Sequence, residues 1–217
     1  MASNDLEIEN SIKTMQTVFA GLEDYRVVGS ILVASMNGKP HRELHDVDLL
    51  IDKRIYQQIL DRFEEADFKR VKKHAPGFKW DEFHKPKHLT FGTLLIGTFE
   101  KDYFLYKANR GLTLTIKTEY LKPTNYTLFG LKIRGIPPRS AYEGIKAASL
   151  NSKRKKDKQI VAKYMGVKIT DGLSINQAFN VKLFGIRVPY LYALFSQVYN
   201  LIGGIRLRFG KSYDPWM

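Results

Sequence analysis

The chain has 217 residues, of which 44% are apolar, and it carries a net charge of +13. This length and this apolar content can form a sizeable buried core, which excludes an intrinsically disordered protein. The sequence contains no cysteine, so disulfides, thiolate zinc sites and cysteine nucleophiles are excluded. Its polar, acidic N-terminal stretch lacks the features of a secretory signal, and we therefore expect a cytoplasmic protein.

The charge is distributed unevenly along the chain. Residues 1–121 contain 18 basic and 18 acidic side chains, whereas residues 122–217 contain 17 basic and 4 acidic ones. A neutral, acid-rich half can hold a divalent metal, and a basic half attracts phosphate, nucleic acid or an anionic membrane surface. The alternative interpretation of the basic half is an ordinary solubilising surface.

Hydrophobic periodicity and turn residues predict the order of helices and strands. Helices are expected over residues 10–22, 31–36 with Ser30 as cap, and 53–66, and strands over 25–28, 47–52, 68–71, 88–96, 103–106, 112–118 and 126–134. After Pro137-Pro138 the pattern changes to helices over 140–150, 154–165 and 174–179. This order predicts an α/β (α+β) protein with a mixed sheet and flanking helices over residues 1–136, followed by a basic helical region over 137–217.

Two aspartates open the strand over residues 47–52. Alternate residues of a strand point to the same face, so Asp46 and Asp48 place two carboxylates on one side, about 7 Å apart. Mg²⁺ or Mn²⁺ is bound in this way, by one or two carboxylates together with phosphate oxygens of a substrate. Ser30 and the backbone amides at the start of the preceding helix are suited to a triphosphate, because a helix N-terminus favours anions.

Two stretches carry a family resemblance. Residues 27–52 resemble the signature of polymerase-β-like nucleotidyltransferases, with Gly29-Ser30, then a basic residue, Arg42, and then the Asp-x-Asp strand. Residues 140–157 resemble the helix that follows the sheet in the minimal, lincosamide and abortive-infection nucleotidyltransferases. The matching positions there are Glu143, Lys146, Arg154, Lys156 and Asp157.

The resemblance implies a nucleotidyltransferase fold and transfer of a nucleoside monophosphate from an NTP to an acceptor. It implies that Asp46 and Asp48 hold the metal and act in catalysis, and that Gly29, Ser30, Arg42 and Lys146 bind the nucleotide. The basic run is expected to contact phosphates of the acceptor or nucleotide, and it consists of Lys153, Arg154, Lys155 and Lys156. The alternatives are an exposed helix lysine at 146 and a solvated helix start at 153–156, with Asp157 capping the helix or pairing with a neighbour.

A third carboxylate usually completes the metal site of this superfamily from a neighbouring strand. The expected place falls near Thr115, where no carboxylate stands. Glu119 shares the face of Thr115 by the period of two and is the predicted substitute, ahead of Glu100 and Asp102. Otherwise Asp46 and Asp48 suffice to hold the metal without a third carboxylate, or the protein has lost catalysis.

Two further segments allow alternative interpretations. The aromatic and basic stretch 74–86 either packs as a hydrophobic loop over the sheet edge, which we favour, or stacks a base or sugar of the acceptor. Residues 188–205 carry no charge and are expected to form a buried helix. An interfacial helix on an anionic membrane surface is the alternative for this segment.

The expected acceptor is an anion because the C-terminal half is basic. An RNA end such as that of tRNA is our first choice, as the resemblance to abortive-infection toxins of toxin–antitoxin systems allows. A small-molecule acceptor of the antibiotic type is the second, since cationic aminoglycosides fit this charge poorly. The competing hypothesis is an inactive nucleotidyltransferase-fold protein that binds nucleic acid or nucleotide.

Overall fold

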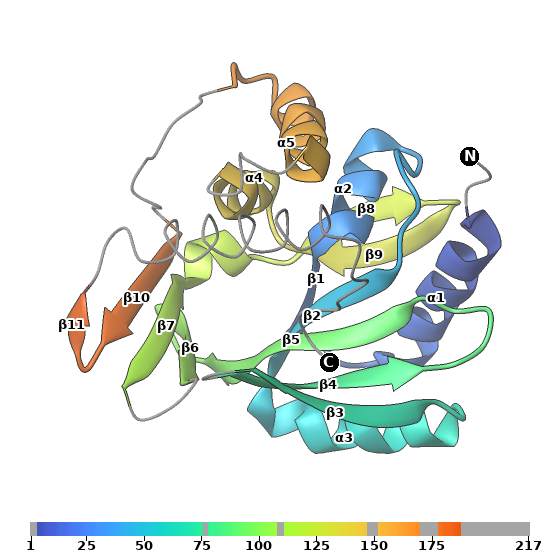
Figure 1. Cartoon of the computed structure of the whole chain (residues 1–217), viewed down its shortest axis with the longest axis horizontal. Helices are drawn as coiled ribbons and strands as arrows, with labels where there is room; N and C mark the ends of the chain where they lie inside the picture. The colour runs from blue at the N-terminus through green and yellow to red at the C-terminus, as the bar shows by residue number, and fades with distance from the viewer. Residues whose placement is uncertain (1–3, 76–77, 108–110, 147–151, 170–177, 188–217) are drawn as a thin grey trace, which may run out of the picture.

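The structure is a computed structural model, and it describes residues 4–75, 78–107, 111–146, 152–169 and 178–187 (Figure 1). The helices are α1 Asp5–Val18, α2 Gly29–Asn37, α3 Lys53–Glu65, the 3-10 helix η1 Thr118–Leu121, α4 Pro138–Lys146 and α5 Ser152–Met165. The strands are β1 Tyr25–Val28, β2 Asp46–Asp52, β3 Lys69–Ala75, β4 Phe78–His84, β5 Thr90–Phe99, β6 Tyr103–Lys107, β7 Leu112–Lys117, β8 Thr124–Leu128, β9 Leu131–Gly135, β10 Phe179–Leu183 and β11 Ile186–Arg187. The protein is therefore the mixed α/β protein that the sequence predicts.

All the described strands belong to one mixed sheet. Its order is β11-β10-β7-β6-β5-β2-β1-β9-β8, and the β3–β4 hairpin joins through β4 to β5. The acid-bearing β2 lies between β1, which runs antiparallel to it, and β5, which runs parallel to it. The segment that opens with the two aspartates is thus in the middle of the sheet.

Strand β5 connects two parts of the sheet. Its first half pairs with β4 and its last residues pair with β6, while β2 lies along its other edge. The register of β2 against β5 shifts between Asp48 and Leu50, which marks a β-bulge or irregularity beside the aspartates. Bulges of this kind commonly re-aim side chains next to active sites.

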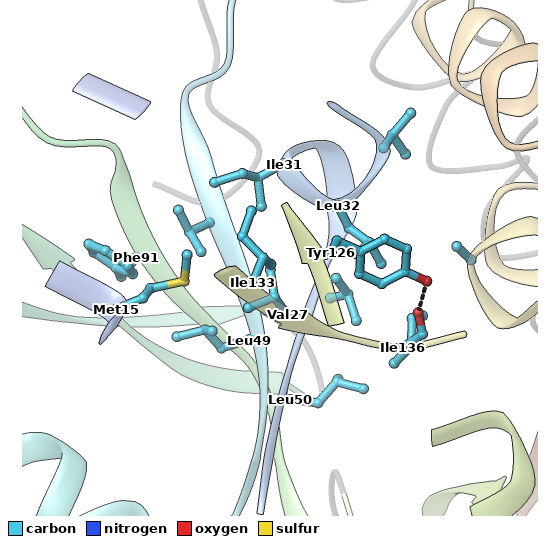
Figure 2. Close-up of a cluster of buried hydrophobic side chains, with 14 of the residues drawn as sticks. Met15, Val27, Ile31, Leu32, Leu49, Leu50, Phe91, Tyr126, Ile133 and Ile136 are labelled. Atoms are coloured by element: carbon cyan, nitrogen blue, oxygen red, sulfur yellow. Dashed lines mark hydrogen bonds between the residues drawn. The ribbon is translucent and has the colours of Figure 1, made fainter. Parts of the chain in front are cut away.

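Helices α1 and α3 cover one face of the central strands. Phe63 of α3 is fully buried and stacks on Phe83 of β4 at 4.2 Å between ring centroids, and its ring also lies 5.1 Å from that of Phe91. Figure 2 shows Met15 of α1 beside Leu49 and Phe91 in the same core. The residues of β2 that face these helices, Val47, Leu49 and Ile51, are completely buried.

Helix α2 lies on the β1, β8 and β9 side of the sheet and contacts α5 (Figure 1). Figure 2 shows its Leu32 close to Tyr126, whose hydroxyl donates a hydrogen bond of 2.7 Å to the carbonyl of Ile136. Among the described residues, no helix is both long enough and apolar enough to cross a membrane.

The structure corrects several predicted elements. The first helix begins at Asp5 rather than at residue 10, because Ile8 and Ile12 already supply its buried face. The strand predicted over 126–134 is a hairpin, β8–β9, which turns at Phe129 and Gly130, both with positive φ.

Two segments that the sequence predicts as a loop and as a helix contain strands in the structure. Residues 78–84 of the expected loop form β4, and residue 179, the end of an expected helix, begins β10. β4 forms because it pairs with β3 in a hairpin and with β5, whereas β10 forms by pairing with β7, which is distant in sequence. The C-terminal region is consequently not wholly helical, and its predicted boundary at residue 137 stays a prediction.

Asp52 ends β2 and fixes it to α3 and β5. Its buried carboxylate accepts hydrogen bonds from the backbone N–H of Arg54 at 2.7 Å and of Phe99 at 2.8 Å, and from the Arg54 guanidinium. Burial by itself would raise the pKa of this carboxyl, but the hydrogen bonds from Arg54 and the two backbone groups outweigh burial and lower it. The ionised form therefore stabilises the fold.

The substitution Asp52→Asn, which keeps an oxygen for the helix cap, tests this charge. Because the folded pKa is lowered, the stabilisation is present above about pH 4 and is lost as the pH falls below it. We expect the substitution to reduce the free energy of unfolding by about 1–2 kcal/mol near pH 7 and by less near pH 3. Urea unfolding at both pH values measures this, and an equal loss at both would contradict it.

Phe63 is the centre of the core beneath the acid strand, since its ring also contacts Phe19 and Phe68. We expect Phe63→Ala to lower the free energy of unfolding by about 3–5 kcal/mol, because it leaves a cavity among packed rings. Leu6→Ala, at a residue of α1 that is 64% exposed, is the control and should change it by less than about 0.5 kcal/mol. Urea unfolding of both variants measures the difference.

Candidate nucleotide and metal site

The two aspartates lie on the face of β2 opposite the α1–α3 core. Asp46 is exposed and Asp48 is half-buried, while Val47 between them is fully buried. The period of two along the strand therefore gives the arrangement expected from the sequence.

Gly29 brings the N-terminus of α2 against Asp48. It begins the helix directly after β1, whose last residue, Val28, pairs with Asp48. Its φ is +72°, and a Cβ at this position would lie 2.3 Å from Oδ2 of Asp48. Only glycine fits such a position, both for its backbone conformation and for its distance from the carboxylate.

Ser30 lies beside Asp46. Its buried hydroxyl donates to Oδ1 of Asp46 over 3.5 Å. The prediction that Ser30 caps the helix is wrong, because α2 begins one residue earlier and its N-cap is Val28. Val28 has no capping side chain, so the first N–H groups of α2 are left to other acceptors, and they begin next to the acid pair.

The loop before the acids is attached to α5 by a residue pair that the sequence did not reveal. Nε2 of His41 lies 2.6 Å from Oδ1 of Asp157, and both side chains are buried. Nε of Arg42 lies 3.7 Å from the same oxygen, and the Lys156 ammonium donates to the carbonyl of His41. Asp157 thus pairs across the fold with a residue distant in sequence, whereas the sequence suggested a cap or a pair with a neighbour. Arg42 is held by Asp157 and by the carbonyl of Glu43.

The other predicted basic residues belong to α4 and α5. Lys146 ends α4, and the run 153–156 forms the first turns of α5. Lys155 and Lys156 are exposed, which fits both interpretations of the run, phosphate contact and a solvated helix start. The side chains of Lys146, Lys153 and Arg154, and all of the segment 188–205, lie outside what the structure describes. Their predicted roles stay predictions.

The expected third carboxylate does not come from β7. Two strands, β6 and β5, separate β7 from β2, so the expectation that β7 adjoins the acid strand is wrong. Glu119 lies on η1, where it is exposed and 3.8 Å from the ammonium of Lys117. Thr115 of β7 instead donates to the carbonyl of Asn180 on β10.

Strand β5, which adjoins β2 on one side, has no carboxylate beside Asp46 and Asp48. Thr90 is in register with Asp46, and Gly92 is in register with Asp48. Within the described part of the chain, no group of three or more His, Asp or Glu side chains is close enough to hold a metal by itself. The acid pair, the helix start and the glycine are therefore the components of the candidate site.

Comparison with solved structures identifies the fold. The chain is similar to a lincosamide antibiotic adenylyltransferase, LnuA, in a lincomycin-bound structure, with a TM-score of 0.59 and 16% identity over 72% of this chain and 97% of LnuA. The chain has the fold of the polymerase-β-like nucleotidyltransferases. The resemblance inferred from the acid motif is thereby confirmed at the level of the fold.

The antibiotic-resistance factor ANT(2'')-Ia has the same fold. Its solution structure matches with a TM-score of 0.54 and 6% identity over 93% of this chain and 96% of that one. Its crystal structure with adenylyl-2''-tobramycin matches with a TM-score of 0.51 and 7% identity over 72% and 90%. The sequence itself matches no family model and no curated protein. The fold has therefore persisted where most side chains differ.

The contact between Gly29 and Asp48 can be tested with a matched glycine. Gly21 has the same φ of +72°, but a Cβ there would meet nothing within 4 Å. We expect Gly21→Ala to cost about 1–2 kcal/mol for the left-handed backbone alone. Gly29→Ala should cost about 1–3 kcal/mol more, because its methyl group must displace the Asp48 carboxylate. Urea unfolding measures both, and equal costs would mean that the contact does not constrain the site.

Proposed function

We propose that this protein is a metal-dependent nucleotidyltransferase that moves a nucleoside monophosphate from an NTP to an acceptor hydroxyl. The contact between Gly29 and Asp48 is the observation that supports this best. It brings the N–H groups of a helix start next to two carboxylates on one strand face. A helix start binds phosphate and the carboxylates bind a cation, and a nucleoside triphosphate with its metal needs both.

The acid pair fits Mg²⁺ or Mn²⁺. Asp46 is exposed and Asp48 is half-buried, so both can supply oxygens while the substrate phosphates supply others. A bound divalent ion would neutralise charge on the phosphates and favour departure of pyrophosphate. The protein's own part is to hold the carboxylates in place through the Ser30 hydroxyl and the β2 ladder, and to direct the first amides of α2 at phosphate oxygens.

Asp157 has a positioning role in this proposal. Through His41 it anchors the loop that leads into β2 to helix α5. The same helix carries the basic run, of which Lys155 and Lys156 are exposed. The pairing thus ties the acid strand to the segment proposed to contact phosphates of the nucleotide or acceptor.

The class of acceptor has two candidates. The similar structures include a lincomycin-bound enzyme and a complex with adenylyl-2''-tobramycin, which favours a small hydroxylated molecule. The excess of basic residues in the C-terminal half favours an anionic acceptor, such as an RNA end. We place the small hydroxylated molecule first, and we prefer a neutral or anionic one because the net charge of +13 repels cations.

The reaction can be tested with labelled NTPs and Mg²⁺ against lincomycin, tobramycin and total RNA. We expect wild-type protein to label one acceptor, and Asp46→Asn or Asp48→Asn to reduce the rate at least about 100-fold by removing a metal-binding charge. The control, Asp61→Asn, changes an exposed carboxylate of α3 and should keep the wild-type rate.

Failure to transfer any nucleotide to any acceptor would contradict the proposal. Nucleotide or RNA binding that persists in that case, and weakens as salt is added, would instead support the inactive, ligand-binding form of the fold.

A further inference from the structure

A second polar group shares the strand face of the acid pair. Asp48, Gly92 and Glu82 are in register across β2, β5 and β4, and Asp46 and Thr90 are in register beside them. Residues in register on neighbouring strands project to the same face. Glu82 therefore lies on the acid face, across Gly92 from Asp48, and glycine leaves no side chain between them.

Four side chains on this face form a continuous hydrogen-bonded row. The Trp80 indole N–H donates to Oε1 of Glu82 at 3.1 Å, and Oε2 of Glu82 lies 3.0 Å from Nε2 of His84. Nδ1 of His84 lies 3.3 Å from Oγ1 of Thr90. The row thus runs from Trp80 on β4 to Thr90 on β5, and Thr90 is the register partner of Asp46.

The direction of these hydrogen bonds follows from the chemistry of the groups. An indole nitrogen can only donate, and a carboxylate can only accept. In the neutral imidazole, Nε2 of His84 therefore carries the hydrogen that points to Glu82, and the lone pair of Nδ1 points to the Thr90 hydroxyl, which donates to it. The Lys73 ammonium lies 3.9 Å from Oε2 of Glu82.

The side chains of His84 and Glu82 differ in their exposure to solvent. The His84 side chain is 40% exposed, whereas that of Glu82 is 17% exposed. The charged groups near the imidazole are Glu82 on its own strand, Lys69 and Lys73 on β3, and Asp46 on β2 beyond Thr90; Lys69 is in register with His84. An oriented imidazole whose lone pair faces a hydroxyl, backed by a carboxylate, is the arrangement by which proteins accept a proton from a hydroxyl.

We infer that His84 is the general base of the proposed transfer and that Glu82 is its positioning residue; this inference rests on the proposed function. The acceptor hydroxyl oxygen forms a bond to the α-phosphorus, and the bond from that phosphorus to the pyrophosphate oxygen breaks. Pyrophosphate leaves with the electron pair. The hydroxyl proton passes to Nδ1 of His84, directly or through the Thr90 hydroxyl, and then to water. Glu82 stabilises the imidazolium through Nε2.

The test compares His84→Gln with His88→Gln in the full chain. His88 lies four residues away, and its Nδ1 contacts only the Pro86 carbonyl among the described hydrogen bonds. Transfer is measured with Mg²⁺, the NTP and whichever of lincomycin, tobramycin and total RNA wild-type protein labels most. We expect His84→Gln to reduce kcat about 100- to 10,000-fold, with the Kd for the nucleotide unchanged, and His88→Gln to match the wild type.

The variant Glu82→Gln distinguishes a role in positioning the base from a purely structural role, because the two predict different pH–rate profiles. Loss of the carboxylate makes the imidazolium less stable, so the acid limb of the pH–rate profile should move to lower pH while kcat falls. In His84→Gln that limb should be absent. ¹⁵N spectra of the labelled histidines should show the wild-type His84 hydrogen on Nε2, independently of activity.

The outcomes separate this inference from the proposed function. Transfer by wild-type protein with an equal rate in His84→Gln would overturn the role of His84 and leave the nucleotidyltransferase proposal intact. A hydrogen on Nδ1 in the wild-type spectra would also overturn it. Absence of transfer in wild-type protein would overturn both.

Discussion

The close approach of Gly29 to Asp48 is the constraint on which the rest of the candidate site depends. Strand β1 ends beside Asp48, and the chain must enter α2 at once for the helix N-terminus to lie next to that carboxylate. The turn needs a positive φ and has no room for a Cβ. A residue without a side chain meets both demands, and it brings a group that attracts anions into contact with groups that attract cations.

The surrounding structure supports this contact from both ends of β2. At the far end, the Asp52 carboxylate is fixed by backbone N–H groups from α3 and β5, which sets the strand between them. At the near end, the loop that leads into Asp46 is attached to α5 through His41 and Asp157. The acid pair is consequently presented by a strand held along its whole length, with an apolar core behind it.

The fold is shared with antibiotic-modifying nucleotidyltransferases at identities of 16% or less. At this distance the shared feature is the backbone arrangement. Beside Asp48, β5 carries glycine, and the next strand, β4, carries glutamate and histidine on the same face. In the proposal that His84 acts as base, the base comes from β4, the strand beyond β5, and Thr90 of β5 lies between His84 and Asp46.

The acid pair, the glycine-serine turn and the central strands could be predicted from the sequence, and the resemblance that they carry predicted the fold. These depend on local patterns: the period of two in residues 46–52, the Gly-Ser dipeptide, and apolar periodicity in α3. The strands that adjoin β2 are known only from the tertiary structure, in which β5 and β6 separate β7 from β2 and Glu119 lies on η1. The tertiary structure also brings Glu82 and His84 of β4 onto the sheet face of the acid pair, and it places His41 against Asp157. Strand order and the pairing of residues distant in the chain set these relations, and no local pattern encodes them. The β3–β4 hairpin is the exception, because the Pro-Gly dipeptide at 76–77 is a turn signal that could have predicted it.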